Sequence, residues 1–154
     1  MAPFLFAPIE RELAAIQADR ESGSAQLAER ALALLGQACA LAGGEPPEAL
    51  LPGIASLVRR IRTLRPTMAA PGNWALAFLL DLRGRLRASP PPSPPEAGRA
   101  AAGALRERLR GHTVRLAEAA RPILGGKRAL LTLSNSSTVE AALLQAAPPD
   151  CLVI

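Results

Sequence analysis

The sequence predicts a mainly α-helical protein that ends in a βαβ unit of a parallel sheet. Apolar residues recur at helical spacing through most of residues 8–120, a proline-rich stretch lies at 88–98, and short apolar runs then alternate with a polar turn and a helix. A hydrophobic content of 49% with 20% charged residues excludes general disorder. We therefore expect a helical N-terminal domain over 1–122, with the linker inside it, and an incomplete α/β segment over 123–154.

Amphipathic helices are expected before the proline-rich stretch wherever apolar residues repeat three and four positions apart, at 8–19, 25–42, 52–64 and 73–87. Ser24 is the expected N-cap of the second helix, because a serine hydroxyl can accept a hydrogen bond from a free helical amide. Pro52 suits the first turn of the third helix. Pro66 ends that helix, because a proline pushes the residue before it out of the α region.

The proline-rich stretch 88–98 is expected to be an extended linker, since its prolines favour neither helix nor sheet. A fifth helix is expected beyond it, over residues 97–120, with His112 on its apolar stripe. A single histidine at such a position is typical of a half-buried packing residue, and a catalytic role is less expected.

The pattern changes after residue 126. The apolar run 129–133 indicates a buried strand, the polar turn 134–137 follows it, and a helix is expected at about 137–146. Residues 151–154 form a second apolar run, so the segment has the order strand, helix, strand. Such a unit predicts two adjacent parallel strands with a right-handed crossover. Two strands leave open edges and an uncovered apolar face, which we expect at Leu130, Leu131, Leu152, Val153 and Ile154.

Three segments of the sequence carry a family resemblance: IQADRESGSAQLAERALALL (16–35), LRPTMAAPGNWAL (64–76) and LLTLSNSSTVEAALLQA (130–146). They resemble the family of initiation factor 2B regulatory subunits and the related sugar-phosphate isomerases. The resemblance implies a helical N-terminal domain and a Rossmann-like C-terminal domain. Because the chain stops after its second apolar run, we expect here the first βαβ unit of a truncated Rossmann-like parallel sheet, as in an N-terminal half of such a protein.

The resemblance also implies candidate ligand-binding residues. Arg65 stands in the Arg-Pro-Thr motif, where the isomerases place an arginine at the phosphate or a hydroxyl of the sugar. Equally, Arg65 could only close the carbonyls at the end of the third helix. Arg20 and Gly23 fall near the family's Arg-Gly-Ala turn. A further group occupies the turn after the first strand, where parallel sheets bind ligands and a helix N-terminus suits an anion: Ser134, Asn135, Ser136 and Ser137. Helix capping by Ser136 or Ser137 is the simpler interpretation of that turn.

The same comparison predicts that the chain is not a catalyst. Ser134 stands where the isomerases have their catalytic cysteine, Leu133 replaces the preceding histidine, and Ser22 replaces the arginine of the Arg-Gly-Ala turn. A serine without an adjacent base is a poor acid or base at neutral pH. The family's catalytic aspartate belongs to a later strand. We therefore expect an initiation factor 2B-like, non-catalytic regulatory or assembly-type subunit or fragment, with residual binding of a phosphorylated sugar or nucleotide and no cofactor or metal.

Two alternatives stay open. The chain could be the N-terminal part of an isomerase acting on methylthioribose-1-phosphate or ribose-1,5-bisphosphate. It could also be a basic helical module that binds nucleic acid, since the formal net charge is +5. Binding of nucleic acid is the less expected, because the arginines are spread along the chain and few aromatic residues are present for stacking on bases.

Partners and location are expected from the same features. A homo-oligomer, or a protein that completes the sheet, would cover the open strand edges. No apolar run is long enough for a membrane span, and two distant cysteines make no disulfide framework, so we expect a cytoplasmic protein.

Overall fold

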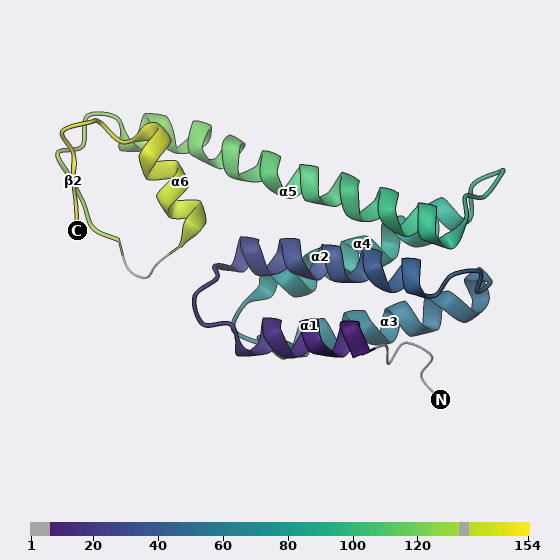
Figure 1. The fold of residues 1–154 in the computed structure, drawn as a ribbon. Helices are drawn as coiled ribbons and strands as arrows, with labels where there is room; N and C mark the ends of the chain where they lie inside the picture. Colours follow the sequence, from purple (N-terminus) through teal and green to yellow (C-terminus); the bar gives the residue numbers. More distant parts are fainter. Residues whose placement is uncertain (1–6, 133–135) are drawn as a thin grey trace. The chain divides into compact units, whose positions relative to one another are not determined.

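A computed structural model describes residues 7–132 and 136–154 and shows a mainly helical chain (Figure 1). Its elements, in order, are α1 (Ala7–Ala18), α2 (Ser24–Leu41), α3 (Pro47–Leu64), α4 (Ala69–Leu86), α5 (Pro94–Leu124), β1 (Ala129–Leu130), α6 (Ser137–Ala146) and β2 (Leu152–Val153). The chain divides into two compact units, residues 1–106 and 107–154, and α5 runs through the boundary. Within the described residues, every helix is too short or too polar to cross a bilayer.

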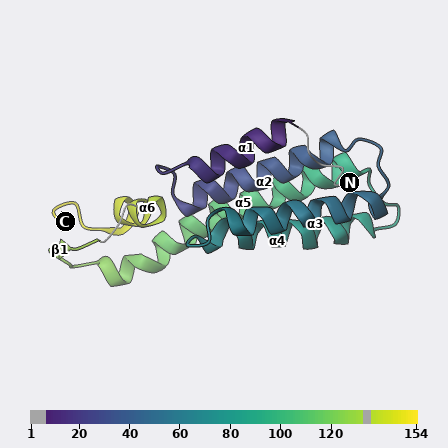
Figure 2. The same cartoon turned by 90° about the horizontal axis from the view of Figure 1, so that it is seen from below.

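The first unit is built around helices that lie side by side, as Figure 2 shows for α1 to α4. α4 packs against both α2 and α3, and α1 packs against α2 and α3. The apolar stripes that the sequence predicts form the core. The largest fully buried side chains are Ile9, Leu13, Ile16, Leu27, Leu32, Leu34, Leu35, Leu50, Ile54, Ile61, Phe78 and Leu82. Each contributes about 1.5–3 kcal/mol of burial free energy, so this unit has a core of its own.

The beginning of α5 approaches α2 closely through glycines. A Cβ atom added to Gly98 would lie 2.3 Å from the Cβ of Cys39, and one added to Gly36 would lie 3.1 Å from the Cβ of Ala102. Contacts this short require small residues on both helices. The glycines therefore fix the distance between α2 and α5 within the first unit.

The predictions for α1 and α2 are confirmed within one or two residues, but the expected starts of α3 and α4 are wrong. α3 begins at Pro47 and α4 at Ala69, each several residues before the predicted start. The first amides of a helix have no partner within it, so Pro47 and Pro71 lose nothing in the first turns. Pro52 lies inside α3, on its exposed side. Its nitrogen cannot donate to the carbonyl four residues earlier in the helix, and water can bind that carbonyl instead.

The N-cap of α2 is Gly23 and not Ser24. The Gly23 amide donates to Gln26 Oε1 at 2.9 Å, which is half of a capping box. The side chain three residues into the helix therefore caps this end, and the serine hydroxyl does not.

The predicted linker 88–98 is also too long. α5 begins at Pro94, and Ser93 with Glu96 forms a capping box before it: the Ser93 amide donates to Glu96 Oε2 at 3.0 Å, and the Glu96 amide donates to Ser93 Oγ at 3.4 Å. The helix then continues to Leu124, beyond its predicted end. His112 is exposed and is not the half-buried packing residue that its position predicts.

The second unit contains the predicted βαβ unit. β1 and β2 pair in parallel, with Ala129 opposite Leu152 and Leu130 opposite Val153, and α6 lies between them in the sequence. The hydrogen bonds extend past the two-residue strands, because the Thr132 amide donates to the Ile154 carbonyl at 2.8 Å. The parallel arrangement is therefore confirmed.

The expectation of a buried first strand is wrong, and the expectation of an uncovered apolar face is confirmed. Leu131 is 73% exposed, and the second strand is open as well, with Leu152 60%, Val153 46% and Ile154 65% exposed. Leu130 is only half-buried, and Leu133 lies outside the described residues. A pair of strands has too little surrounding structure to bury both faces, so the apolar residues are present without a complete cover.

Candidate functional site

The turn between α1 and α2 is organised by the carboxylate of Asp19. Its Oδ1 accepts hydrogen bonds from the amides of Glu21 at 2.9 Å and Ser22 at 2.8 Å. These bonds, from Ser22 first, lower the pKa of Asp19 to about 2. Asp19 is thus a charged acceptor at neutral pH that shapes the residues between the helices.

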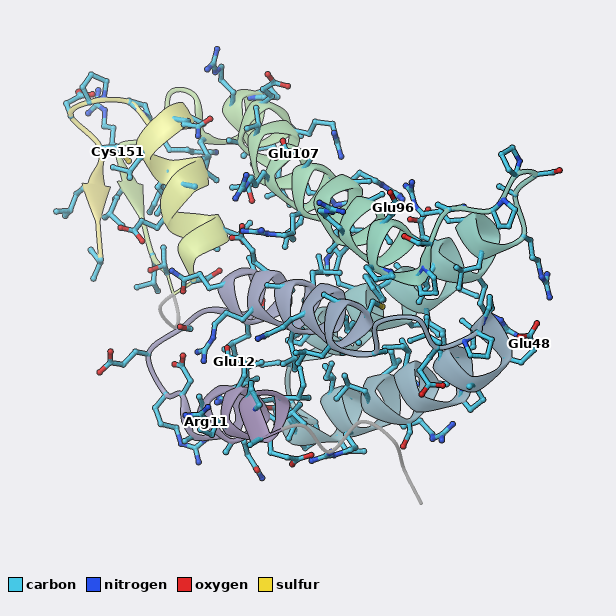
Figure 3. The ribbon with its side chains drawn as sticks, turned by 45° about the vertical axis from the view of Figure 1, so that its right-hand side comes forward. Arg11, Glu12, Glu48, Glu96, Glu107 and Cys151 are labelled. Carbon is cyan, nitrogen blue, oxygen red and sulfur yellow. The ribbon has the colours of Figure 1, made fainter. Side chains whose placement is uncertain are left out.

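Arg30 of α2 ties this turn to α1. Its guanidinium donates to Glu12 Oε1 at 2.8 Å and to Asp19 Oδ2 at 2.7 Å. The hydrogen bond to Glu12 is the main reason why the pKa of Arg30 is raised. Figure 3 labels Glu12 on α1, beside the beginning of α2. Arg30 is therefore engaged in structure and not offered to a ligand.

Arg65, the main candidate, is also engaged. It is the C-cap of α3 and starts the turn to α4, in which the Met68 amide donates to the Arg65 carbonyl at 2.9 Å and Pro66 takes the second position. Its guanidinium donates to the main-chain carbonyl of Asp19. The expectation that Arg65 closes the carbonyls of its own helix is therefore wrong, because the carbonyl belongs to the end of α1.

This contact joins segments that are distant in the sequence. Asp19 lies in 16–35 and Arg65 in 64–76, which are the first and second stretches that carry the family resemblance. The helices of the first unit bring these stretches together at one end of the bundle. Sequence reasoning missed the contact, since no local pattern links a carbonyl to an arginine 46 residues later.

The other candidates in this region differ in their surroundings. Arg20 is exposed, and in the part of the chain that the structure describes its guanidinium makes no hydrogen bond or ion pair. Gly23 has a φ of −70°, which any residue can adopt, and its amide is held by Gln26. Arg20 is therefore available to a ligand, while Gly23 is placed as a helix cap.

The serine turn belongs to the second unit. Ser134 and Asn135 lie outside the described residues, and Ser137 is the first residue of α6. Ser136 is the N-cap of α6, and its Oγ accepts a hydrogen bond from the Val139 amide at 3.4 Å. The capping interpretation of this turn is confirmed for Ser136.

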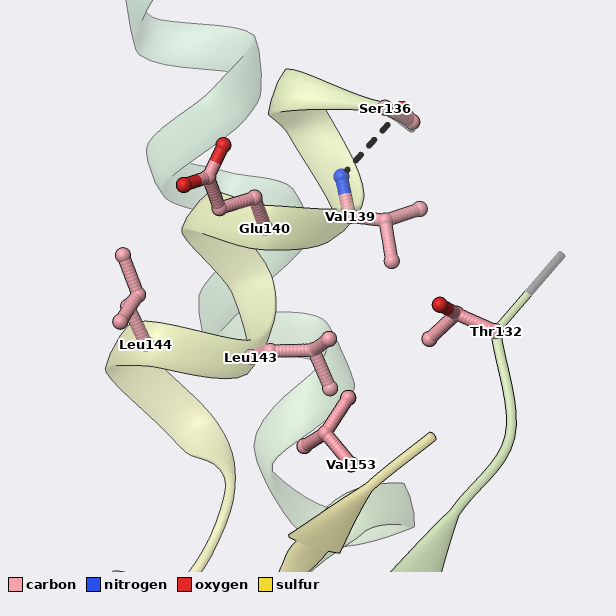
Figure 4. A pocket seen from close by; sticks show the side chains of 7 residues that line it. All are labelled: Thr132, Ser136, Val139, Glu140, Leu143, Leu144 and Val153. Atoms are coloured by element: carbon pink, nitrogen blue, oxygen red, sulfur yellow. Dashed lines mark hydrogen bonds between the residues drawn. The ribbon is translucent and has the colours of Figure 1, made fainter. Parts of the chain in front are cut away.

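A pocket of about 420 Å³ lies beside this cap, between α6 and the strands (Figure 4). Its lining is mostly apolar: Thr132, Ser136, Val139, Glu140, Leu143, Leu144 and Val153. In Figure 4, Leu143 and Val153 approach one another and Thr132 faces them from the neighbouring strand. Sequence reasoning missed Glu140, whose carboxylate adds negative charge to the first turn of α6.

Arg65 belongs to the first unit and the serine turn to the second. The buried thiol gives no alternative site. Cys39 is buried, which raises its pKa to about 12, and a thiol with that pKa is not a nucleophile. Among residues 7–132 and 136–154, no cluster of histidine, cysteine and carboxylate side chains could hold a metal ion.

Comparison with known proteins gives no assignment: no family model matches the sequence, and no curated protein matches it.

Proposed function

We propose that this chain is an initiation factor 2B-like protein of the cytoplasm that acts as a non-catalytic, regulatory or assembly-type subunit. The family resemblance of the segments 16–35, 64–76 and 130–146 supports it. The bond between Arg65 and the Asp19 carbonyl supports it further, because two of these segments meet there. In this proposal, the βαβ unit is the beginning of a Rossmann-like sheet.

The absence of catalysis in this proposal rests on the residues at the expected reaction centre. Ser134 offers an alcohol where the isomerases use a thiol, and Leu133 offers no proton. Arg65 already donates to a main-chain carbonyl, and Glu140 lines the pocket next to the serine turn. That carboxylate would weaken the binding of a negatively charged sugar phosphate.

The assembly role rests on one observation: the βαβ unit exposes apolar side chains along its strands. Leu131, Leu152 and Ile154 are each at least 60% exposed. Burying one such side chain contributes about 1.5–3 kcal/mol, whereas a whole domain is stable by only about 5–15 kcal/mol. Further protein that covers these strands would therefore contribute a large stabilisation. A second copy of the chain, or a protein that supplies neighbouring strands, fits this surface.

Sedimentation of the purified chain at micromolar concentration tests the assembly role. We expect a dimer or larger species that Val153→Asp shifts to the monomer, because a buried carboxylate in the contact costs several kcal/mol. Leu41→Asp is the matched control, since Leu41 is 41% exposed on the first unit and Val153 is 46% exposed. A monomer whose amides across 129–154 are strongly protected from hydrogen exchange would refute this part of the proposal.

Residual binding of a phosphorylated sugar or nucleotide belongs to the same proposal. The first amides of α6 favour an anion, and the family resemblance separately implies that Arg65 contacts the sugar phosphate. Calorimetry with ribose-1,5-bisphosphate should show weak binding, and Arg65→Lys should weaken it nearly as much as Arg65→Ala, because lysine lacks the planar fork. Binding that is unchanged in both variants would remove Arg65 from the proposed site.

A coupled assay distinguishes the proposal from the isomerase alternative. We expect no conversion of methylthioribose-1-phosphate or ribose-1,5-bisphosphate by the purified chain. Turnover that disappears in Ser134→Ala would contradict the non-catalytic role and favour the isomerase.

A further inference from the structure

The outer face of α3 and α4 combines positive charge with exposed leucines. The sequence has no aspartate or glutamate from Ala49 to Leu80, and between Asp81 and Glu96 there is again none. Arginines are frequent in the same part of the chain: Arg59, Arg60, Arg62, Arg65, Arg83, Arg85 and Arg87. The nearest acid on α3 is Glu48, which Figure 3 labels at the first turn of that helix.

These arginines fall into two groups. Arg60 is held by both oxygens of Glu10 at 2.6 Å, Arg85 is held by Asp81 at 2.6 Å, and Arg65 binds the Asp19 carbonyl. The second group is exposed, and within the described residues its guanidinium groups make no hydrogen bond or ion pair. We call its members the outer arginines: Arg59, Arg62, Arg83 and Arg87. They are charges that the fold itself does not use.

Leucines lie between the outer arginines. Leu76 and Leu80 of α4 are 39% and 60% exposed, and their spacing places them on the same side of the helix as Arg83 and Arg87. A groove of about 210 Å³ runs beside them between the two helices, lined by Leu51, Pro52, Ala55, Leu79 and Arg83. The centre of the face is therefore apolar, and the groove lies toward its Arg83 end.

The helices are antiparallel, so the outer arginines stand at both ends of this apolar centre. At one end Arg62 lies over α4, because a Cβ atom added to Gly72 would be 2.9 Å from its Cγ. At the other end Arg83 lies beside Pro52 and Ala55 in the groove. Gly72 and Arg83 are separated along α4 by about 16 Å at 1.5 Å per residue, which is three helical turns.

We propose that this face binds an amphipathic helix of a partner protein, with acidic side chains about three turns apart and apolar side chains between them. The groove between two helices accepts the side-chain ridge of a third, and the acids would pair with the outer arginines at each end. A nucleic acid fits less well, because its phosphates require positive charge along the whole path, and here leucines interrupt it. The inference concerns the first unit and does not depend on the proposed function.

Fluorescence anisotropy with a designed peptide tests the inference. The probe is a labelled helical peptide of about 18 residues, with glutamates three turns apart and leucines between them. At physiological ionic strength we expect micromolar binding to the full chain, and no binding of the same peptide with lysines in place of its glutamates. Arg59→Glu combined with Arg87→Glu should weaken binding at least about tenfold, and Leu80→Ser should weaken it about tenfold.

Controls come from other helices of the same unit. Arg11→Glu on α1 and Leu41→Ser on α2 change an exposed arginine and an exposed leucine, and should alter binding by less than about twofold. Circular dichroism should be unchanged in all variants, because every substituted side chain is exposed. The inference is overturned if the controls weaken binding as much as the test variants. It is also overturned if a short DNA duplex or phosphatidylserine vesicles bind more tightly and Leu80→Ser has no effect, which would make the face a general polyanion surface.

Discussion

The two units of the chain use similar apolar residues with opposite results. In the first unit, Leu27, Leu35 and Phe78 are completely buried, and ion pairs such as Arg60 with Glu10 connect helices across the bundle. In the second unit, Leu144 is 81% exposed and Leu131 is 73% exposed. Helices brought together by their apolar stripes can close a core by themselves, whereas two parallel strands and a helix cannot. The difference separates a unit with a closed apolar core from a unit whose large apolar side chains are mostly exposed.

The largest expected effect comes from removing the centre of the first core. Phe78→Ala should lower the free energy of unfolding by about 3–5 kcal/mol, because it deletes a fully buried ring and leaves a cavity. Leu144→Ala should change it by less than about 0.5 kcal/mol, because that side chain is already in water. Urea unfolding followed by circular dichroism compares the two. If Leu144→Ala costs as much as Phe78→Ala, the contrast between the units is wrong.

The contact between α2 and α5 gives the next effect. Gly98→Ala should cost about 1–3 kcal/mol, because its Cβ atom would collide with that of Cys39 and the helices would have to separate. Gly103→Ala, in the same helix, should instead stabilise by up to about 1 kcal/mol, because nothing lies within 4 Å of the added atom. Thermal unfolding of both variants measures the difference. Equal midpoints would show that α5 does not approach α2 this closely.

Loss of a helix N-cap should have a smaller effect on stability, and the effect should differ between α5 in the first unit and α6 in the second. Ser93→Ala removes both bonds of the serine hydroxyl, which donates to Glu96 Oε2 at 2.6 Å and accepts from the Glu96 amide at 3.4 Å, and should cost about 1 kcal/mol. Ser136→Ala removes a single bond of the hydroxyl, which accepts from the Val139 amide at 3.4 Å, and should cost less. Amide hydrogen exchange at the start of α5 and of α6 reads the two ends separately. Equal loss of protection at both ends would contradict the geometry of the two caps.

Much of this architecture follows from periodic patterns in the sequence. The stripe of Ile9, Leu13 and Ile16 predicts α1, and apolar runs on either side of a polar turn predict parallel strands. Prolines misled the prediction, because Pro47 and Pro94 begin helices in stretches that resemble loops. The capping box of Ser93 and Glu96 is a local signal that would have corrected the start of α5.

The contacts at the candidate site could not be predicted in the same way. The bond from Arg65 to the Asp19 carbonyl depends on how α1 and α3 end beside each other, and a main-chain carbonyl carries no sequence signal. The exposure of Leu131 and Ile154, in contrast, is predicted by the number of strands, because two parallel strands leave an apolar face uncovered, although apolar character alone predicts burial. Long-range packing therefore decides the role of the arginine, and the number of strands decides the openness of the sheet.

The smallest effect should be the pH dependence contributed by Asp19 in the first unit. Its pKa is about 2 in the folded chain, below the ordinary value of 3.8, mainly because the Ser22 amide donates to the carboxylate. A group with a depressed pKa stabilises the fold above its unfolded pKa, and that stabilisation is lost as the pH falls through the folded pKa.

Asp19→Asn keeps an oxygen for the amides but loses the charge that Arg30 contacts. The variant should therefore be less stable than the parent at pH 7, and the two should converge between about pH 4 and pH 2. Thermal unfolding over this range measures the difference, with Asp150→Asn in the second unit as a control. A gap between parent and Asp19→Asn that persists unchanged at pH 2 would show that the carboxylate charge does not stabilise the turn between α1 and α2.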